Sequence, residues 1–185
     1  MIPFMSPGER DLFRKYLNNA VHYWEFGGGG STAWASTTNT IKSIVTIESD
    51  KNYVAKLKAD FKNADIRWID IGPTGAWGAP SDTSKVVDWN LYPNSWLTKS
   101  NEPDMVLIDG RFRVACALTV LTKSDTTNNP YVLIHDFNNR PEYHCVLLFY
   151  KVIETVDTLV VLQKKDSYDN DFAKVLLEKY YMVYS

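Results

Sequence analysis

The stretch "HYWEFGGGGSTAWAS", residues 22–36, decides the fold. It joins an apolar run, four successive glycines and a Ser-Thr pair. Glycine is unfavourable inside a helix or strand, because ordering it costs more backbone entropy than ordering any other residue. Four glycines between a strand-like run and a helix-like run therefore indicate a turn at which another group approaches bare backbone.

Five short apolar runs alternate with helix-length segments on both sides of this turn. The runs predict strands at residues 20–26, 43–49, 65–72, 103–110 and 130–137. Apolar spacing and capping patterns predict helices at residues 6–19, 31–40, 50–61, 111–122, 141–151 and 169–181. A β-hairpin is expected to turn at residues 156–158, and residues 73–96 have the turn-rich composition of a long loop.

This alternation predicts an α/β fold, specifically a three-layer Rossmann-like sandwich. Its sheet is expected to be mostly parallel, with the antiparallel hairpin at one edge. The chain has 185 residues, of which 45% are hydrophobic. That is enough sequence for one core, so a single domain over residues 1–185 is expected.

The composition of the chain bears on whether it binds nucleic acid, enters a membrane or is secreted. A formal net charge of -2 argues against a nucleic-acid-coating protein. No apolar window of 18 residues suggests a membrane span, and residues 1–17 lack the pattern of a signal peptide. Cys116 and Cys145 lie in apolar runs and are expected to be buried free thiols. The expectation is a cytoplasmic protein with no nucleic-acid or membrane partner and with its oligomeric state open.

The glycine run has the spacing of a nucleotide-binding turn. Residues 28–33, "GGGSTA", match G-x-G-x-x-A, and Glu48 lies 20 positions after Gly28 (48 − 28). This spacing places the Glu48 carboxylate where it accepts hydrogen bonds from ribose hydroxyls. A plain flexible surface loop is the alternative.

Two ligands of this kind suit the turn. NAD needs a helix N-terminus at its pyrophosphate, and a dehydrogenase usually needs a second region for its substrate. S-adenosylmethionine instead carries a positive sulfonium, which is favoured by carboxylates such as Glu25, Glu48 and Asp109. The methyl donor is therefore preferred.

Five segments carry a resemblance to a known family. They stand in the order "EFGGGGST" (25–32), "VTIESD" (45–50), "DIGPTGAWG" (70–78), "VLIDGRFRVACAL" (106–118) and "LIHDFNNRPEY" (133–143). From about residue 23 to 165 the chain resembles the class I S-adenosylmethionine-dependent methyltransferases. Its "IDGRFRVACAL" segment is similar to a bacterial and viral branch of that superfamily.

The resemblance implies S-adenosylmethionine as the cofactor and suggests which residues hold it. The methionine part would be held by Glu25, Gly27, Gly29, Ser31 and Thr32. Gly28 joins this set because four consecutive glycines leave the donor-facing position open by one residue. The remaining cofactor contacts would be Glu48 and Ser49 at the ribose, Asp70 and Ile71 at the adenine, and Asp109 and Gly110 beneath the sulfur.

His135 and Asp136 follow the fifth apolar run and, with Asp109, form the candidate catalytic group. His135 is expected to be the general base, because its ordinary pKa of about 6.5 suits proton transfer near neutrality. The alternative is a histidine that only hydrogen-bonds a neighbouring loop. Asp109, Asp136 and Asn138 also suit magnesium, but the preferred interpretation needs no metal: Asp109 contacts the donor and Asp136 orients an arginine.

Two arginines and several loop aromatics are candidates for binding the acceptor. Arg111 and Arg113 open a predicted helix, the unfavourable end for cations, which suggests a grip on a carboxylate or phosphate. An ion pair with Asp109 or Asp136 is the alternative. Trp77 and Tyr92, with Trp96, are expected either to stack on adenine or a sugar or to pack the loop down.

The predicted function is S-adenosylmethionine-dependent O-methylation of a small polar acceptor such as a sugar hydroxyl. Two alternatives stay open. One is a non-catalytic module that binds a nucleotide or nucleotide-sugar, and the other is a small NAD-dependent oxidoreductase.

Overall fold

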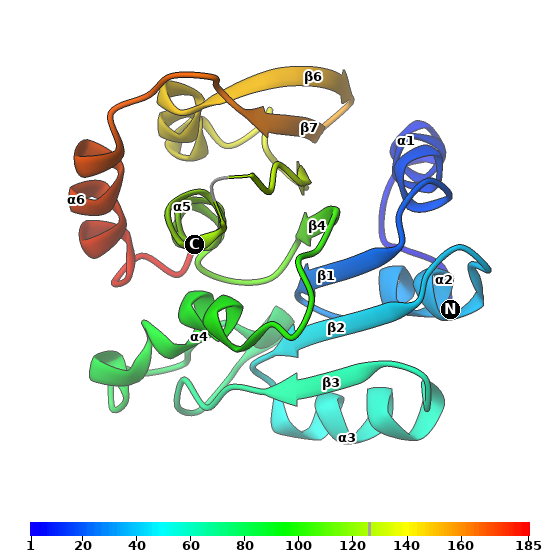
Figure 1. The fold of residues 1–185 in the computed structure, drawn as a ribbon. Helices are drawn as coiled ribbons and strands as arrows, with labels where there is room; N and C mark the ends of the chain where they lie inside the picture. Colours follow the sequence, from blue (N-terminus) through cyan, green and yellow to red (C-terminus); the bar gives the residue numbers. More distant parts are fainter. Residues whose placement is uncertain (126) are drawn as a thin grey trace.

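The protein is described by a computed structural model that covers residues 1–125 and 127–185. Over this part of the chain, seven strands form one sheet in the order β3-β2-β1-β4-β5-β7-β6 (Figure 1). The strands are β1 (His22–Phe26), β2 (Ser43–Glu48), β3 (Asp65–Trp68), β4 (Met105–Ile108), β5 (Tyr131–Ile134), β6 (Tyr150–Val156) and β7 (Leu159–Lys164).

The sheet has the predicted topology. Strands β1 to β5 pair in parallel, and β7 pairs antiparallel to both β5 and β6. The chain runs outward from β1 through β2 to β3 and then returns to β4 on the other side of β1. This reversal is the switch point at which ligands bind in open α/β sheets, just beyond the carboxyl ends of the strands.

Helices cover both faces of the sheet (Figure 1). They are α1 (Pro7–Leu17), α2 (Gly30–Thr37), α3 (Lys51–Asp60), α4 (Leu91–Asn94), α5 (Arg113–Lys123) and α6 (Asn170–Tyr180). Side-chain caps begin three of them: Ser6 caps α1, Asp50 caps α3 and Asp169 caps α6. Each cap satisfies backbone N–H groups that have no partner inside the helix.

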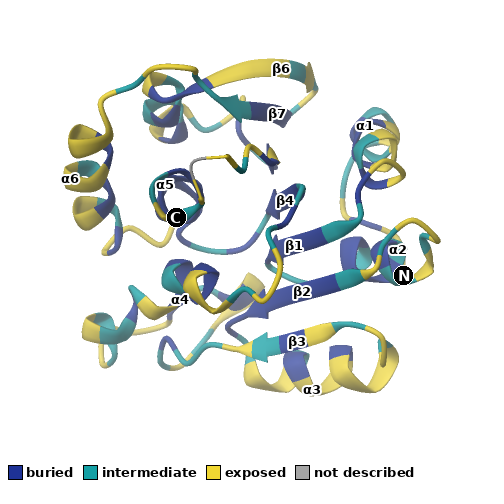
Figure 2. Cartoon of the chain, viewed as in Figure 1, coloured by how far each residue is buried: buried dark blue, intermediate teal, exposed yellow. Residues whose placement is uncertain are grey.

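Alternate residues of the central strands pack into two large hydrophobic cores, and a smaller cluster forms between α3 and β3. Trp24 and Val106 pack with the α5 side of the sheet, whereas Tyr23 and Leu107 pack with α1. Figure 2 shows the central strands as buried and the outer sides of α3 and α6 as exposed. Burial on both faces explains why these strands are continuous apolar runs rather than alternating ones.

Two segments and one cysteine depart most from the sequence prediction. Strand β3 ends at Trp68 rather than at residue 72, because β2 ends at Glu48, its partner there, and offers no further pairing. The helix expected over residues 141–151 is a 3-10 helix at Pro141–Leu148, since the chain then enters β6 at Tyr150 to pair with β7. Cys116 is buried as expected, but Cys145 is only half-buried; both thiols are free.

The long loop after β3 contains short helical turns. Besides α4, these are 3-10 helices at Ala76–Gly78, Val86–Asp88 and Ser95–Thr98. Trp96 is fully buried beneath this loop, so for this residue the packing alternative holds. Among the described residues, no helix is both long and apolar enough to cross a membrane.

Candidate active site

A cavity of about 1020 Å³ opens at the carboxyl ends of the central strands. Its lining comes from the glycine turn after β1, Glu48 at the end of β2, the residues that follow β4 and β5, and an N-terminal segment, residues 1–6. This volume lies at the upper end of the range for small-molecule sites, so it has room for a donor and an acceptor side by side.

The glycine turn is shaped partly by contacts of the protein with itself. Gly27 has a φ of +90°, and a Cβ there would lie 2.6 Å from the backbone of Gly110. A Cβ on Gly28 would lie 2.6 Å from the side chain of Leu57 in α3. These two glycines therefore let the turns after β1 and β4, and helix α3, approach each other closely.

The other two glycines differ in what they face. A Cβ on Gly30 would collide with the backbone of Ile2 in the N-terminal segment. A Cβ on Gly29 would meet only the Tyr53 hydroxyl, at 3.3 Å. Of the four, Gly29 is thus the residue at which an added Cβ would meet the fewest atoms of the protein.

Glu25 holds the glycine turn in place through hydrogen bonds to the residues that follow it. It is fully buried at the end of β1, and its carboxylate accepts hydrogen bonds from Tyr23 (2.8 Å), Ser31 (2.6 Å), Thr32 (2.5 Å) and Thr46 (2.7 Å). Burial raises its pKa, although the four hydroxyls oppose that effect. Glu25 and Thr32 do not line the cavity, whereas Ser31 does.

Glu48 lines the cavity at the end of β2. Its Oε1 accepts from the backbone N–H groups of Ser49 (2.6 Å) and Asp50 (3.0 Å), and its Oε2 accepts from that of Gly28 (3.3 Å). Burial raises the pKa of Glu48 against the effect of these N–H groups. Ser49, which also lines the cavity, donates to the carbonyl oxygen of Gly78 at 2.9 Å.

Asp70 and Ile71, the residues expected at the adenine side, do not line the cavity. Ile71 is fully buried, and Asp70 forms an ion pair with Lys85. The same loop instead brings Trp77 to the cavity, with 77% of its surface exposed. The reason is the early end of β3, which turns the chain away before residue 70.

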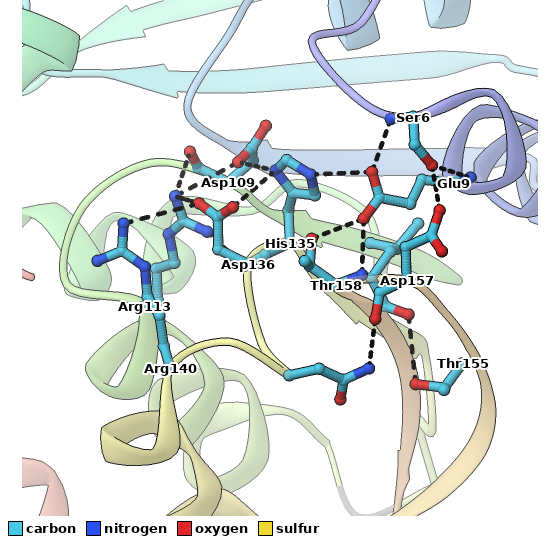
Figure 3. Close-up of polar contacts among 12 residues, drawn as sticks. Ser6, Glu9, Asp109, Arg113, His135, Asp136, Arg140, Thr155, Asp157 and Thr158 are labelled. Atoms are coloured by element: carbon cyan, nitrogen blue, oxygen red, sulfur yellow. Dashed lines mark hydrogen bonds and ion pairs between the residues drawn. The ribbon is translucent and has the colours of Figure 1, made fainter.

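The candidate catalytic residues meet in the part of the cavity lining that follows β4 and β5 (Figure 3). His135 follows β5; its Nδ1 lies 2.9 Å from Asp109 Oδ1 and its Nε2 lies 3.4 Å from Glu9 Oε2. Burial alone would lower the pKa of His135, but the hydrogen bond and charge of Asp109, with the charges of Asp136 and Glu9, raise it above its ordinary 6.5. The imidazole therefore lies between two carboxylates.

Arg113 ties Asp109 and Asp136 together. Its guanidinium is buried and lies 3.0 Å from Asp136 and 3.4 Å from Asp109. It also donates to the backbone carbonyls of Gly110, at 3.1 Å, and His135. For Arg113 the structure thus shows the ion-pair alternative. Asp136 has a φ of +56°, an uncommon conformation that Asp tolerates better than most residues.

Glu9 is a site residue that the sequence analysis did not single out as functional. Its carboxylate accepts from the backbone N–H (2.8 Å) and hydroxyl (2.6 Å) of Thr158 and from the backbone N–H of Ser6 (2.7 Å). Burial would raise its pKa, but these bonds and the charge of His135 lower it to about 2. The sequence signal was the capping pattern of Ser6 and Glu9, which says nothing about Thr158 or His135.

The N-terminal segment lies across the mouth of the cavity. The ring of Phe4, a residue 82% exposed, packs against that of Trp77 with centroids 5.6 Å apart. The Tyr53 hydroxyl donates to the sulfur of Met1 at 3.7 Å. The contact of Phe4 with Trp77, which joins residues 1–6 to the loop after β3, could not be predicted from the sequence.

Tyr92 and Arg111, two of the predicted acceptor-binding residues, also line the cavity, but their surroundings differ. Tyr92 is buried rather than exposed, and its hydroxyl donates to the carbonyl of Ile47 at 3.4 Å. Arg111 is half-buried and follows Gly110 in the turn after β4. Thus of the two predicted substrate-binding arginines, Arg113 is enclosed by carboxylates and Arg111 is not.

The cluster Asp109, His135 and Asp136 offers ligand atoms within 4.8 Å of one another, a spacing that a metal ion could use. Arg113, however, already lies against both carboxylates, and His135 shares Asp109. Positive charge is thus supplied by the protein itself, so these residues fit a divalent cation poorly.

Known structures share this fold. A methyltransferase-like protein of Silicibacter pomeroyi is 30% identical, with a TM-score of 0.89 over 98% of this chain and 97% of its own. An O-methyltransferase of Bacillus cereus, in complex with S-adenosylhomocysteine, is 13% identical, with a TM-score of 0.56 over 89% and 84%. An N-methyltransferase of Bradyrhizobium japonicum, also in complex with S-adenosylhomocysteine, is 10% identical, with a TM-score of 0.51 over 86% and 89%.

A scan against protein-family models finds no match, and a search of curated proteins finds no relative. The assignment therefore rests on the structures. Those neighbours have the fold of class I S-adenosylmethionine-dependent methyltransferases, with helices on both faces of a mostly parallel sheet. At 30% identity over nearly the whole of both chains, the protein belongs to the same family as the methyltransferase-like protein of Silicibacter pomeroyi.

Proposed function

We propose that the protein transfers a methyl group from S-adenosylmethionine to an oxygen atom of a small polar acceptor. One observation carries the proposal: a single cavity joins the glycine turn and Glu48 at one end to His135, Asp109 and Asp136 at the other. The Bacillus cereus O-methyltransferase of the same fold, bound to S-adenosylhomocysteine, supports this donor.

The donor would lie along the glycine turn. Gly29 and Ser31 face its methionine part, Glu48 accepts hydrogen bonds from the ribose hydroxyls, and Asp109 with Gly110 lies beneath the sulfonium. A charge-assisted hydrogen bond of this kind contributes about 1.5–3 kcal/mol. Glu25 and Thr32 act indirectly, by holding the turn in shape, and Asp70 and Ile71 are left out of the proposed donor contacts because neither lines the cavity.

Methyl transfer requires that the acceptor oxygen be aligned with the methyl carbon and that the acceptor hydroxyl lose its proton. When bound, S-adenosylmethionine supplies the methyl group, which passes in line to the acceptor oxygen as the sulfur leaves. His135 would take the hydroxyl proton on Nε2, with Nδ1–H donated to Asp109; the acceptor hydroxyl would approach Nε2 beside the Glu9 carboxylate, which lies 3.4 Å from it. Glu9 favours the charged imidazole, so proton removal becomes efficient only as His135 loses its extra proton.

The acceptor end of the cavity is polar. Ser6, His135, Asp136, Arg140 and Thr158 line it. Such a lining suits a polyol, for example a sugar hydroxyl, better than a flat apolar ring. A small acceptor, no nucleic-acid partner and a cytoplasmic location are part of the same proposal.

Turnover of labelled methyl groups tests the proposal. Wild-type protein incubated with labelled S-adenosylmethionine and a panel of sugars, sugar acids and sugar phosphates should form an alkali-stable ether. The His135→Ala variant should bind the donor normally and turn over about 10²- to 10⁴-fold more slowly. Equal turnover would remove His135 as the base, and binding of NADH in place of the donor would favour an oxidoreductase.

A further inference from the structure

Of the three arginines that line the cavity in the described part of the chain, Arg111 is the one that forms no ion pair with a carboxylate. It lines the cavity, and its Nε is buried without a hydrogen-bond partner. Within the described ranges 1–125 and 127–185, no Asp or Glu forms an ion pair with its guanidinium. Burial and the positive charges of Arg113 and Arg140 lower the pKa of Arg111, so these cations lie close enough to act on it.

The neighbouring arginines differ in how far they are already engaged. Arg113 lies against Asp136 (3.0 Å) and Asp109 (3.4 Å), which leaves it little capacity for a ligand. Arg140 comes from the turn after β5 and reaches Asp136 only at 3.9 Å (Figure 3). Arg111 and Arg140 therefore keep donors that are free for a bound molecule.

A partly buried cation without a partner is costly, because it has lost water without gaining a counter-charge. Guanidinium groups match carboxylates and phosphates, which accept two parallel N–H bonds. The donor has a carboxylate of its own, but the proposed contacts of its methionine part, Gly29 and Ser31, lie in the turn after β1. Arg111 and Arg140 follow β4 and β5, on the acceptor side of the cavity.

We propose that the acceptor carries an oxyanion, a carboxylate or a phosphate, which Arg111 binds with Arg140 beside it. This inference rests on the proposed methyltransferase function and narrows its substrate to an acidic molecule, such as a sugar acid or a sugar phosphate. Arg113 holds the carboxylates of the site in place and does not contact this oxyanion.

Anion titrations in the presence of saturating S-adenosylhomocysteine test the proposal. The product analogue already supplies the donor's carboxylate, so a remaining anion site belongs to the acceptor. Inorganic phosphate or succinate should bind the wild type, and Arg111→Gln should weaken that binding tenfold or more. Arg111→Lys, which keeps the charge but loses the fork, should fall between them. Arg14→Gln, an exposed arginine outside the cavity, should match the wild type.

Two controls separate this site from a structural arginine and from the donor. The melting temperature of Arg111→Gln should equal or exceed that of the wild type, since an uncompensated charge is removed; a clear drop would indicate a structural role. Its affinity for S-adenosylhomocysteine should change less than twofold. A large loss would place the donor's carboxylate on Arg111 and overturn the inference, as would undiminished phosphate and succinate binding by Arg111→Gln.

If the protein is not a methyltransferase, the titrations should give a different result. The wild type would then not bind S-adenosylhomocysteine at all. The same phosphate titration of the free protein and of Arg111→Gln would still decide whether the anion site exists.

Discussion

Glu9 and His135 are separated by 126 residues in the chain, and their side chains meet across the cavity with Glu9 Oε2 3.4 Å from His135 Nε2. The contact links the first turn of α1 to the end of β5. It makes the N-terminal helix part of the candidate active site, and it adds to the effect of Asp109 and Asp136 on the pKa of the proposed base.

The pH dependence of turnover should move when Glu9 is neutralised. Wild-type turnover should rise with pH, with its inflection above 6.5, because the carboxylates raise the pKa of His135. Glu9→Gln removes one negative charge and should move the inflection to lower pH. A pH–rate profile measures this, with Glu154→Gln, a half-buried glutamate outside the cavity, as control. An unmoved inflection would mean that His135 is not the titrating group.

Stability should fall in acid because of Glu9. Its folded pKa of about 2 lies below the ordinary 4.5, so its stabilisation is present above pH 4.5 and is lost as pH falls through about 2. The loss should be on the order of 3 kcal/mol. Denaturant unfolding at pH 2, 4 and 7 measures it. Glu9→Gln should flatten this part of the profile; a profile like that of the wild type would contradict the assigned pKa.

His135 should change the pH dependence of stability in the opposite sense to Glu9. Its folded pKa is raised, so its stabilisation is complete below the unfolded pKa of about 6.5 and is lost as pH rises through the folded value. Unfolding of the wild type and of His135→Ala between pH 5 and 9 measures the difference. The variant should lose stability mainly at the acid end of this range; a pH-independent deficit would argue against a charged imidazole.

Donor affinity should distinguish Glu48 from Asp70. Glu48→Gln keeps the shape of the side chain but loses the carboxylate that faces the cavity. It should weaken S-adenosylhomocysteine binding by about 10- to 100-fold, the loss of one charge-assisted hydrogen bond. Asp70→Asn is the matched control, because Asp70 does not line the cavity. Calorimetry that ranked the two variants equally would refute this division of roles.

The Phe4–Trp77 contact should help to retain the donor. Phe4→Ala and Trp77→Ala should each weaken binding roughly two- to tenfold, as expected for one aromatic pair worth about 0.5–1.5 kcal/mol. The double variant should be little worse than either single one, since both remove the same contact. Leu97→Ala, an exposed apolar residue outside the cavity, serves as the control. Additive losses would show that the two rings act independently.

Much of the site could be predicted from the sequence because it lies at strand ends. Glu48, Asp109 and His135 each follow an apolar run, and parallel strands bring their carboxyl ends to one edge. The glycine run likewise located the turn after β1. For the fold, the alternation of runs and helices was sufficient, because the central strands β1, β2, β4 and β5 are largely buried on both faces and are therefore easy to recognise.

The residues that escaped prediction depend on contacts between distant segments. Glu9 meets Thr158 and His135 only after the hairpin has docked on α1, and nothing local marks that meeting. Asp70 lies outside the cavity lining because β3 ends four residues early, which no local pattern indicated. Whether Arg111 or Arg113 was paired likewise depended on the turn geometry after β5.

Isothermal titration of the wild-type protein with S-adenosylhomocysteine tests the central claim most directly. The account predicts one binding site per chain, with heat that is strongly reduced in Glu48→Gln and unchanged in Asp70→Asn. A titration without heat, accompanied by no shift in melting temperature, would contradict it.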